Sequence, residues 1–144
     1  MAAIAIPPAL GYRFDTFPDF SDPATRERLS ASALKGFFAI TESWKLNPDQ
    51  QSALLGGVPR STLFKRKTQP TALSQDQLTR ISYIIGVYKA LNILLPKKYA
   101  DAWMTTPNRN LIFGDLQPLQ YAIKFGLPGL AEIRELLDAA RGGR

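Results

Sequence analysis

Apolar residues recur at helical spacing along most of the chain, and no segment shows the strict alternation of a half-buried strand. From residue 74 to 95 they cover a broad surface, which predicts a long helix at the centre of the core. From residue 130 to 140 they share one face, with charged residues on the other. The sequence therefore predicts an all-α protein.

Prolines and capping residues set the expected start of the folded part. Residues 1–22 hold prolines among isolated aromatic residues, which predicts an extended arm instead of a helix. Asp22 is the expected N-cap of a helix that begins at Pro23, and the serines at 30–32 suggest a break in it. Its apolar residues include Leu34, Phe37, Phe38 and Trp44.

Two short helices are then predicted around a glycine turn. Asn47 can cap a helix that Pro48 begins and that Gly56 or Gly57 ends, and Pro59 restarts the chain as a helix at once. Only about three residues would turn the chain between them, which is typical of a helix-turn-helix.

The remaining helices follow from similar signals. Ser74 and Gln77 form the S-x-x-Q pattern of a capping box at the start of the long helix. Beyond it, the sequence predicts a short helix ending near Trp103, a helix over 118–125, and a last helix over about 130–140.

The helix-turn-helix also has the packing residues that this motif needs. Ala53, Gly57 and Leu63 stand at the spacing A-x3-G-x5-L: a small residue, a glycine in the turn and a buried aliphatic residue. The predicted DNA-binding residues are the polar ones left outside: Arg60, Ser61, Thr62, Lys65, Arg66 and Lys67. The first of these would reach base edges, with Arg60 suited to guanine, and the later cations would contact phosphates.

The charge of the chain supports this interpretation. The net charge is +6, yet residues 43–98 alone carry nine Lys and Arg against two Asp, while the segments on either side are nearly balanced. Such asymmetry favours a polyanionic partner. RNA is an alternative to DNA, although we identify no interleaved aromatic platform on the basic segment on which single strands could stack.

Composition argues against an enzyme. The chain has no Cys and no His, which removes thiol nucleophiles, imidazole bases and most metal sites, and its carboxylates form no evident acid and base pair. We expect no cofactor and no catalytic residue. The N-terminus lacks a secretory signal and the longest apolar stretch is too short to cross a bilayer, so a soluble cytoplasmic protein away from the membrane is expected.

The order of these elements resembles the MbcA/ParS/Xre antitoxins over about residues 35–143. The resemblance is most specific at Trp103, at the Asn-Leu-Ile-Phe-Gly turn 110–114, at Pro118-Leu119, and at the closing Leu-Leu-Asp-Ala-Ala-Arg-Gly-Gly, 136–143. Where the family typically has Phe-Gly-Gly before the proline, this chain has Gly114-Asp115. The implied organisation is an arm over 1–22, an Xre-like helix-turn-helix domain over 23–96, and a C-terminal toxin-binding domain over 97–144.

The resemblance also implies partners. The family pairs with NAD-consuming RES-domain toxins of type II toxin–antitoxin systems, so the chain is expected to block the active site of a toxin encoded by the adjacent gene and to repress its own operon as a homodimer on double-stranded operator DNA. The implied toxin-binding residues are Asn110, Phe113, Arg141, Gly142, Gly143 and Arg144. Arg141 and Arg144 are the candidates to reach the toxin's pocket for the phosphates of NAD.

Two other functions stay open from the residues alone. One is a stand-alone helix-turn-helix repressor whose C-terminal part binds a small ligand or only dimerises. The other is an enzyme with a basic substrate channel, which the missing His and Cys disfavour.

Overall fold

The computed structural model describes residues 18–69 and 71–142, and within these ranges the chain is helical with no strand. The all-α prediction is thereby confirmed. Most of the predicted arm, residues 1–17, lies outside the described residues. The elements in chain order are α1 (Pro23–Ser43), α2 (Pro48–Leu54), α3 (Arg60–Thr68), α4 (Gln75–Leu94), α5 (Lys97–Ala102), the 3₁₀ helix η3 (Trp103–Thr105), α6 (Pro118–Phe125) and α7 (Leu127–Gly142).

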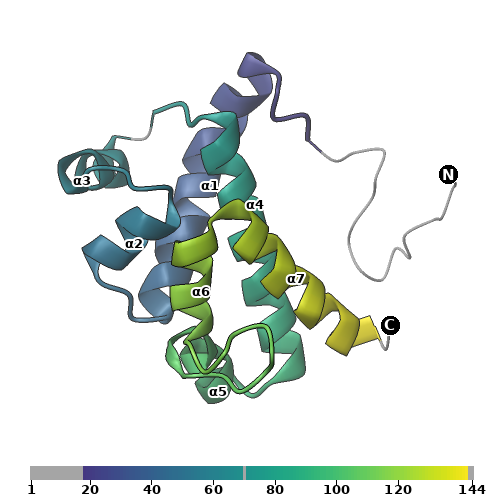
Figure 1. Cartoon of the computed structure of the whole chain (residues 1–144). Coiled ribbons are helices and arrows are strands. Elements are labelled where there is room, and N and C mark those ends of the chain that lie inside the picture. Colours follow the sequence, from purple (N-terminus) through teal and green to yellow (C-terminus); the bar gives the residue numbers. More distant parts are fainter. Residues whose placement is uncertain (1–17, 70, 143–144) are drawn as a thin grey trace, which may run out of the picture.

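Helix α4 lies at the centre of the molecule, as its broad apolar surface predicts. It packs against α1 on one side and, most extensively, against α7 on the other, while α6 packs on α7. Ile84, Val87, Ala90 and Leu91 of α4 are fully buried. Figure 1 shows α3 at one side of the molecule and the C-terminal end of α7 at the opposite side. Helix α4 contacts both the N-terminal half, α1 to α3, and the C-terminal half, α5 to α7. The two halves therefore share one continuous core.

Helix α1 is continuous, so the expected break at residues 30–32 is wrong. The Ser30 hydroxyl donates to the carbonyl of Arg26 within the helix and accepts a hydrogen bond of 2.8 Å from the backbone N–H of Leu73, which precedes α4. The buried Ser30 therefore connects α1 to the segment that precedes α4. Asp22 occupies the N-cap position, but its carboxylate accepts from the Thr25 hydroxyl instead of capping the backbone.

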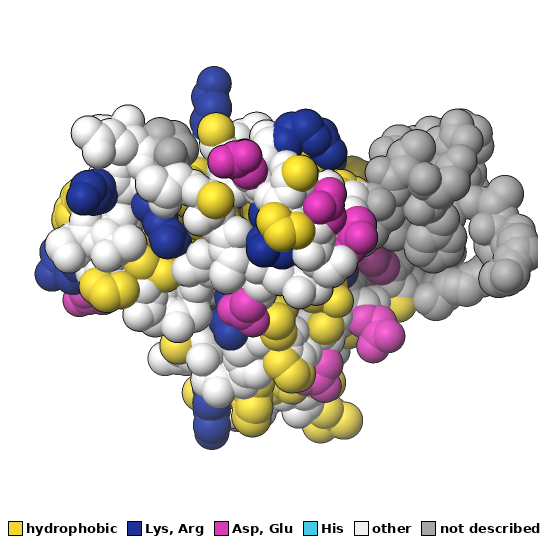
Figure 2. All heavy atoms as spheres, turned by 90° about the horizontal axis from the view of Figure 1, so that it is seen from above, with side chains coloured by type: hydrophobic (Ala, Val, Ile, Leu, Met, Phe, Trp, Pro, Cys, Tyr) yellow, Lys and Arg dark blue, Asp and Glu magenta, His cyan; other side chains and the backbone are white. Residues whose placement is uncertain are grey.

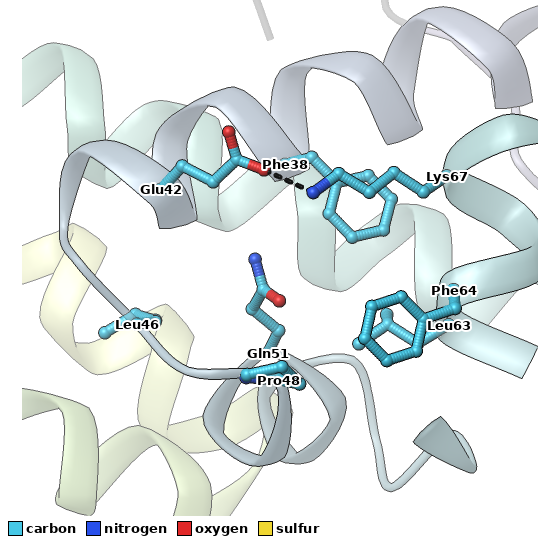
Figure 3. A pocket seen from close by; sticks show the side chains of 8 residues that line it. All are labelled: Phe38, Glu42, Leu46, Pro48, Gln51, Leu63, Phe64 and Lys67. Atoms are coloured by element: carbon cyan, nitrogen blue, oxygen red, sulfur yellow. Dashed lines mark ion pairs between the residues drawn. The ribbon is translucent and has the colours of Figure 1, made fainter. Parts of the chain in front are cut away.

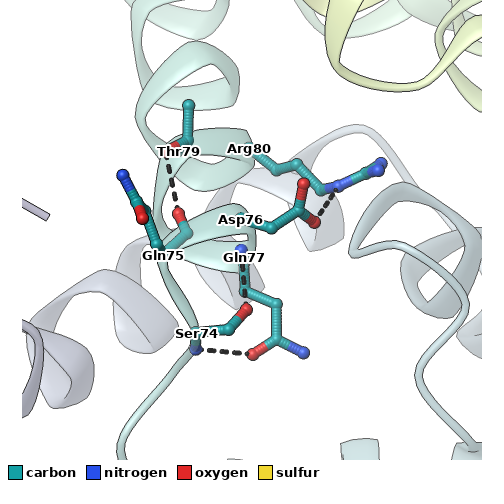
Figure 4. A network of polar contacts seen from close by, with 6 residues as sticks. All are labelled: Ser74, Gln75, Asp76, Gln77, Thr79 and Arg80. Carbon is teal, nitrogen blue, oxygen red and sulfur yellow. Dashed lines mark hydrogen bonds and ion pairs between the residues drawn. The ribbon is translucent and has the colours of Figure 1, made fainter. Parts of the chain in front are cut away.

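The two predicted caps further along are confirmed. Asn47 and Gln50 form a reciprocal capping box at the start of α2. Ser74 and Gln77 do the same for α4, as Figure 4 shows. Each box satisfies two backbone N–H groups that a helix start otherwise leaves unpaired.

One turn later, Arg80 of α4 lies close to both glycine turns. Its Nε pairs with Asp76 at 2.7 Å (Figure 4). The same guanidinium lies beside Gly56, in the turn after α2, and Gly126, between α6 and α7: a Cβ on these glycines would come within 3.4 and 3.5 Å of it.

The C-terminal helices follow the predicted order. Helix α6 has the predicted bounds because Pro118 begins it and Gly126, with φ of 66°, ends it. Helix α7 starts at Leu127, earlier than expected, since Pro128 is accommodated in the first turn of a helix. The Tyr121 hydroxyl donates to Glu132 at 2.5 Å and so ties α6 to α7, and this hydrogen bond raises the pKa of Tyr121.

Candidate functional site

The candidate nucleic-acid interface is the helix pair α2 and α3. Five residues, 55–59, connect the helices, two more than the sequence suggests. Gly56 and Gly57 both have positive φ, 97° and 90°, which lets the chain reverse there as predicted. The Ser52 hydroxyl closes the turn by donating to the carbonyl of Val58.

Apolar residues hold this pair against the core, among them Ala53 and Leu63 of the predicted packing motif. Leu54, Val58 and Leu63 are all buried, and Ala53 is half-buried. Leu63 is the buried residue of α3, so the rest of that helix is at or near the surface. Figure 2 shows Lys and Arg side chains at the edge of the molecule where Figure 1 places α2 and α3.

The six predicted DNA-binding residues do not share one environment. Ser61 and Lys65 are exposed and Thr62 is half-buried. Arg60 is held at 3.5 Å by Asp49 of α2, and its side chain remains 59% exposed. This ion pair joins the N-terminal turns of the two helices and orients Arg60 without covering it.

Arg66 is half-buried, which corrects the expectation that it faces outward, whereas Lys67 is exposed but paired with another helix. The Nε and Nη1 atoms of Arg66 are buried, and neither has a hydrogen-bond partner among the residues that the structure describes. Lys67 pairs with Glu42 of α1 at 2.7 Å and lies 5.5 Å from the centre of the Phe38 ring (Figure 3). Their spacing from Leu63 on α3 places both nearer its buried face.

Sequence reasoning missed an aromatic residue in this interface. Phe64 is 54% exposed on α3, at the rim of a shallow hollow of about 200 Å³ between α1, α2 and α3 (Figure 3). The signal was available, because position 64 is three residues from Ser61 and therefore lies on the same outward face.

The second candidate surface is the loop before α6. Its ends are joined by a hydrogen bond from the N–H of Asn108 to the carbonyl of Leu116. Inside it, the Asn108 side chain accepts from the N–H of Asn110, and the Asn110 side chain accepts from the N–H of Ile112. Asp115 has φ of 72°, so the aspartate keeps the left-handed backbone that glycine adopts most readily.

Phe113 anchors this loop, which corrects its predicted role as a toxin contact. It is 2% exposed and its ring packs edge-on between those of Trp103 and Tyr121, at 5.9 and 5.3 Å. Its neighbour Leu111, which the sequence analysis did not select, is 96% exposed, and Ile112 is 36% exposed. The burial of Phe113 thus leaves Leu111 on the outside of a loop with several internal hydrogen bonds.

The other predicted toxin contacts lie at the end of α7. Arg141 is helical and its guanidinium is 3.8 Å from Asp138, and Gly142 is the last residue of the helix. Gly143 and Arg144 lie outside the described residues. Asn110 is exposed, although its side chain also shapes the loop. Within the described part of the chain, no helix has the length and apolar character of a membrane span.

Two domain families match successive parts of the chain. Residues 22–86 match the antitoxin Xre-like helix-turn-helix domain, and residues 90–143 match the antitoxin Xre/MbcA/ParS C-terminal toxin-binding domain. The two matches meet inside α4. The chain is also 35% identical over 124 residues to the uncharacterized protein y4oB of Sinorhizobium fredii, covering 85% of this chain and 95% of that protein.

These domains bind DNA and a toxin and catalyse no reaction. The helix-turn-helix match contains α2, α3 and their glycine turn, and the toxin-binding match contains the loop of Leu111 and all of α6 and α7. The chain therefore belongs to the Xre/MbcA/ParS antitoxin family.

Proposed function

We propose that this antitoxin neutralises a RES-domain, NAD-degrading toxin encoded by the adjacent gene and represses the operon of both genes. Its toxin-binding half would cover the toxin's active site, and its helix-turn-helix would bind operator DNA in the cytoplasm. The observation that carries the toxin half is the exposure of Leu111, 96%, within the segment that matches a toxin-binding domain.

The Leu111 side chain buries almost no area against the described part of the chain, so it contributes little to the fold there. Leu111 is held on a loop whose backbone is fixed by internal hydrogen bonds, so binding would order little additional structure. Burying a leucine in a pocket of a partner is favourable by about 1.5–3 kcal/mol. Leu111, flanked by Ile112 and Asn110, therefore supports a contact with an apolar pocket of the toxin.

The C-terminal end supplies the second proposed contact. Arg141 and Gly142 end α7, Gly143 and Arg144 follow them in the sequence, and two guanidinium groups suit a pocket that recognises phosphates. In this proposal they occupy the part of the toxin's active site that NAD would use. Asn110 would add a polar contact beside Leu111.

Co-expression with the neighbouring RES-domain protein tests the proposal. The unchanged chain is expected to restore growth and to co-purify with the toxin. Leu111→Asp and deletion of residues 141–144 should each weaken the complex at least tenfold, whereas Phe64→Asp, an equally drastic change at an exposed apolar residue of the other half, should leave it intact. A toxin complex unaffected by both changes would contradict these contacts. Failure of the unchanged chain to bind the toxin would instead favour a stand-alone repressor.

Operon repression and dimerisation are tested separately. A helix-turn-helix reads palindromic half-sites best as a dimer, so we propose a homodimer on the operator. A reporter driven by the promoter upstream of the gene should be repressed by the unchanged chain and released by Lys65→Ala. The mass of the complex with that promoter DNA should correspond to two chains per site.

A further inference from the structure

The outward face of α3 is narrower than its sequence suggests. At 3.6 residues per turn, Ser61, Phe64, Lys65 and Thr68 fall within an arc of about 100° opposite the buried Leu63. All four are exposed. They form the outward face of α3, and they are the side chains that a surface approaching this helix would meet first.

This outward face holds one cation and one large apolar side chain. The remaining cations of α3 lie beside it or behind it: Arg60 is paired with Asp49, Lys67 with Glu42, and Arg66 has two buried nitrogen atoms. Phe64 lies at one edge of this arc and Lys65 at the other, and about half of the area of Phe64 is in contact with solvent.

Phe64 contributes little to the core, since it is 54% exposed and lines a shallow hollow beside Leu63 and Pro48. Covering an exposed phenylalanine with a partner removes apolar area from water and is favourable. The cations around it favour a polyanion over a second copy of this basic helix, because two such faces would repel each other. In the major groove, the apolar group that a base edge presents is the 5-methyl group of thymine.

We infer that Phe64 is a base-reading residue that contacts the 5-methyl group of a thymine, with Lys65 on a neighbouring phosphate. The inference rests on the proposed binding of operator DNA by α3. It adds a sequence preference: each half-site contains a thymine at the position facing Phe64. Arg60, oriented by Asp49, would read a base nearer the start of the helix.

Deoxyuridine substitution tests this contact, because it removes only the methyl group. The probe is the DNA duplex that the full chain selects from a random pool, with each thymine replaced in turn by deoxyuridine. The unchanged protein should lose about fourfold in affinity at the contacted thymine, as expected for one buried methyl group. Phe64→Ala should bind the thymine and deoxyuridine duplexes equally, whereas Phe64→Leu should keep part of the preference.

Lys65→Ala is the matched control. It should weaken binding to both duplexes and keep their ratio, and it should lower the slope of log affinity against log salt by about one unit. The inference is overturned if Phe64→Ala still distinguishes the duplexes as the unchanged protein does, if no thymine position responds, or if Phe64→Ala alters the oligomeric state and not the ratio. Absence of salt-dependent binding to any duplex would overturn the proposed DNA binding itself.

Discussion

The molecule contains two helix pairs joined at glycines, α2 with α3 and α6 with α7, and they are attached to the core in different ways. Helix α3 buries one residue, Leu63, and is fixed from outside by ion pairs to Asp49 and Glu42. Helix α7 buries four residues and packs along α4. The α2–α3 pair is thus held by a few buried apolar residues together with caps and exposed ion pairs, and the α6–α7 pair by more extensive apolar packing.

This difference matches what each surface has to do. A recognition helix keeps most of its side chains outside, so little apolar area remains to stabilise it, and its local opening should require less free energy than that of α4. The toxin-binding half uses buried aromatic rings to hold one exposed loop, which places Leu111 in a fixed position.

The largest loss of stability is expected from removing Phe113, the aromatic residue that anchors the loop before α6. Phe113→Ala should lower the free energy of unfolding by about 3–5 kcal/mol, since it deletes a fully buried ring between Trp103 and Tyr121. Leu111→Ala, two residues away and 96% exposed, should change it little. Urea denaturation measures both, and a loss below about 1 kcal/mol for Phe113→Ala would show that the loop is not anchored there.

An intermediate effect is expected in the glycine turn of the first pair. Gly56 has φ of 97° and lies against Arg80, so Gly56→Ala should cost about 1–2 kcal/mol. Gly36 lies inside α1 with room for a Cβ, and Gly36→Ala should stabilise the protein by about 0.5–1 kcal/mol. Thermal melts of the two variants should therefore shift in opposite directions. Equal shifts would mean that the positive φ of Gly56 is unimportant.

The smallest effect concerns the ion pair that holds α3 to α1. A double-mutant cycle with Glu42→Gln and Lys67→Met should give a coupling of about 0.2–1 kcal/mol that decreases with added salt, because both side chains are about half exposed. Operator affinity at a fixed temperature should change less for Lys67→Met than for Lys65→Met. A larger loss of operator affinity for Lys67→Met than for Lys65→Met would show that Lys67 contacts the DNA.

Local sequence signals accounted for much of the fold. The N-cap at Asn47, the capping box at Ser74 and the start and end of α6 were predicted because each depends on residues within one turn of the chain. The continuity of α1 was not, since Ser30 finds its partner at Leu73, 43 residues away. A serine-rich stretch gives no sign of such a distant backbone donor.

The candidate sites were predicted less well for a related reason. Residue type marked α3 as basic, but which cations face outward depends on Asp49 and Glu42, which come from two other helices. Phe113 was selected as a conspicuous part of the family's loop, and only its packing between Trp103 and Tyr121 shows that it supports the loop while Leu111 is exposed.

The separation of the two binding surfaces is tested most directly by measuring operator and toxin affinity on the same two variants, Lys65→Ala and Leu111→Asp, each shown to be folded by its thermal melt. Lys65→Ala should lower operator affinity and its salt slope while toxin affinity stays unchanged, and Leu111→Asp should lower toxin affinity at least tenfold while operator affinity stays unchanged. Loss of both affinities in either folded variant would contradict two separate surfaces on one chain.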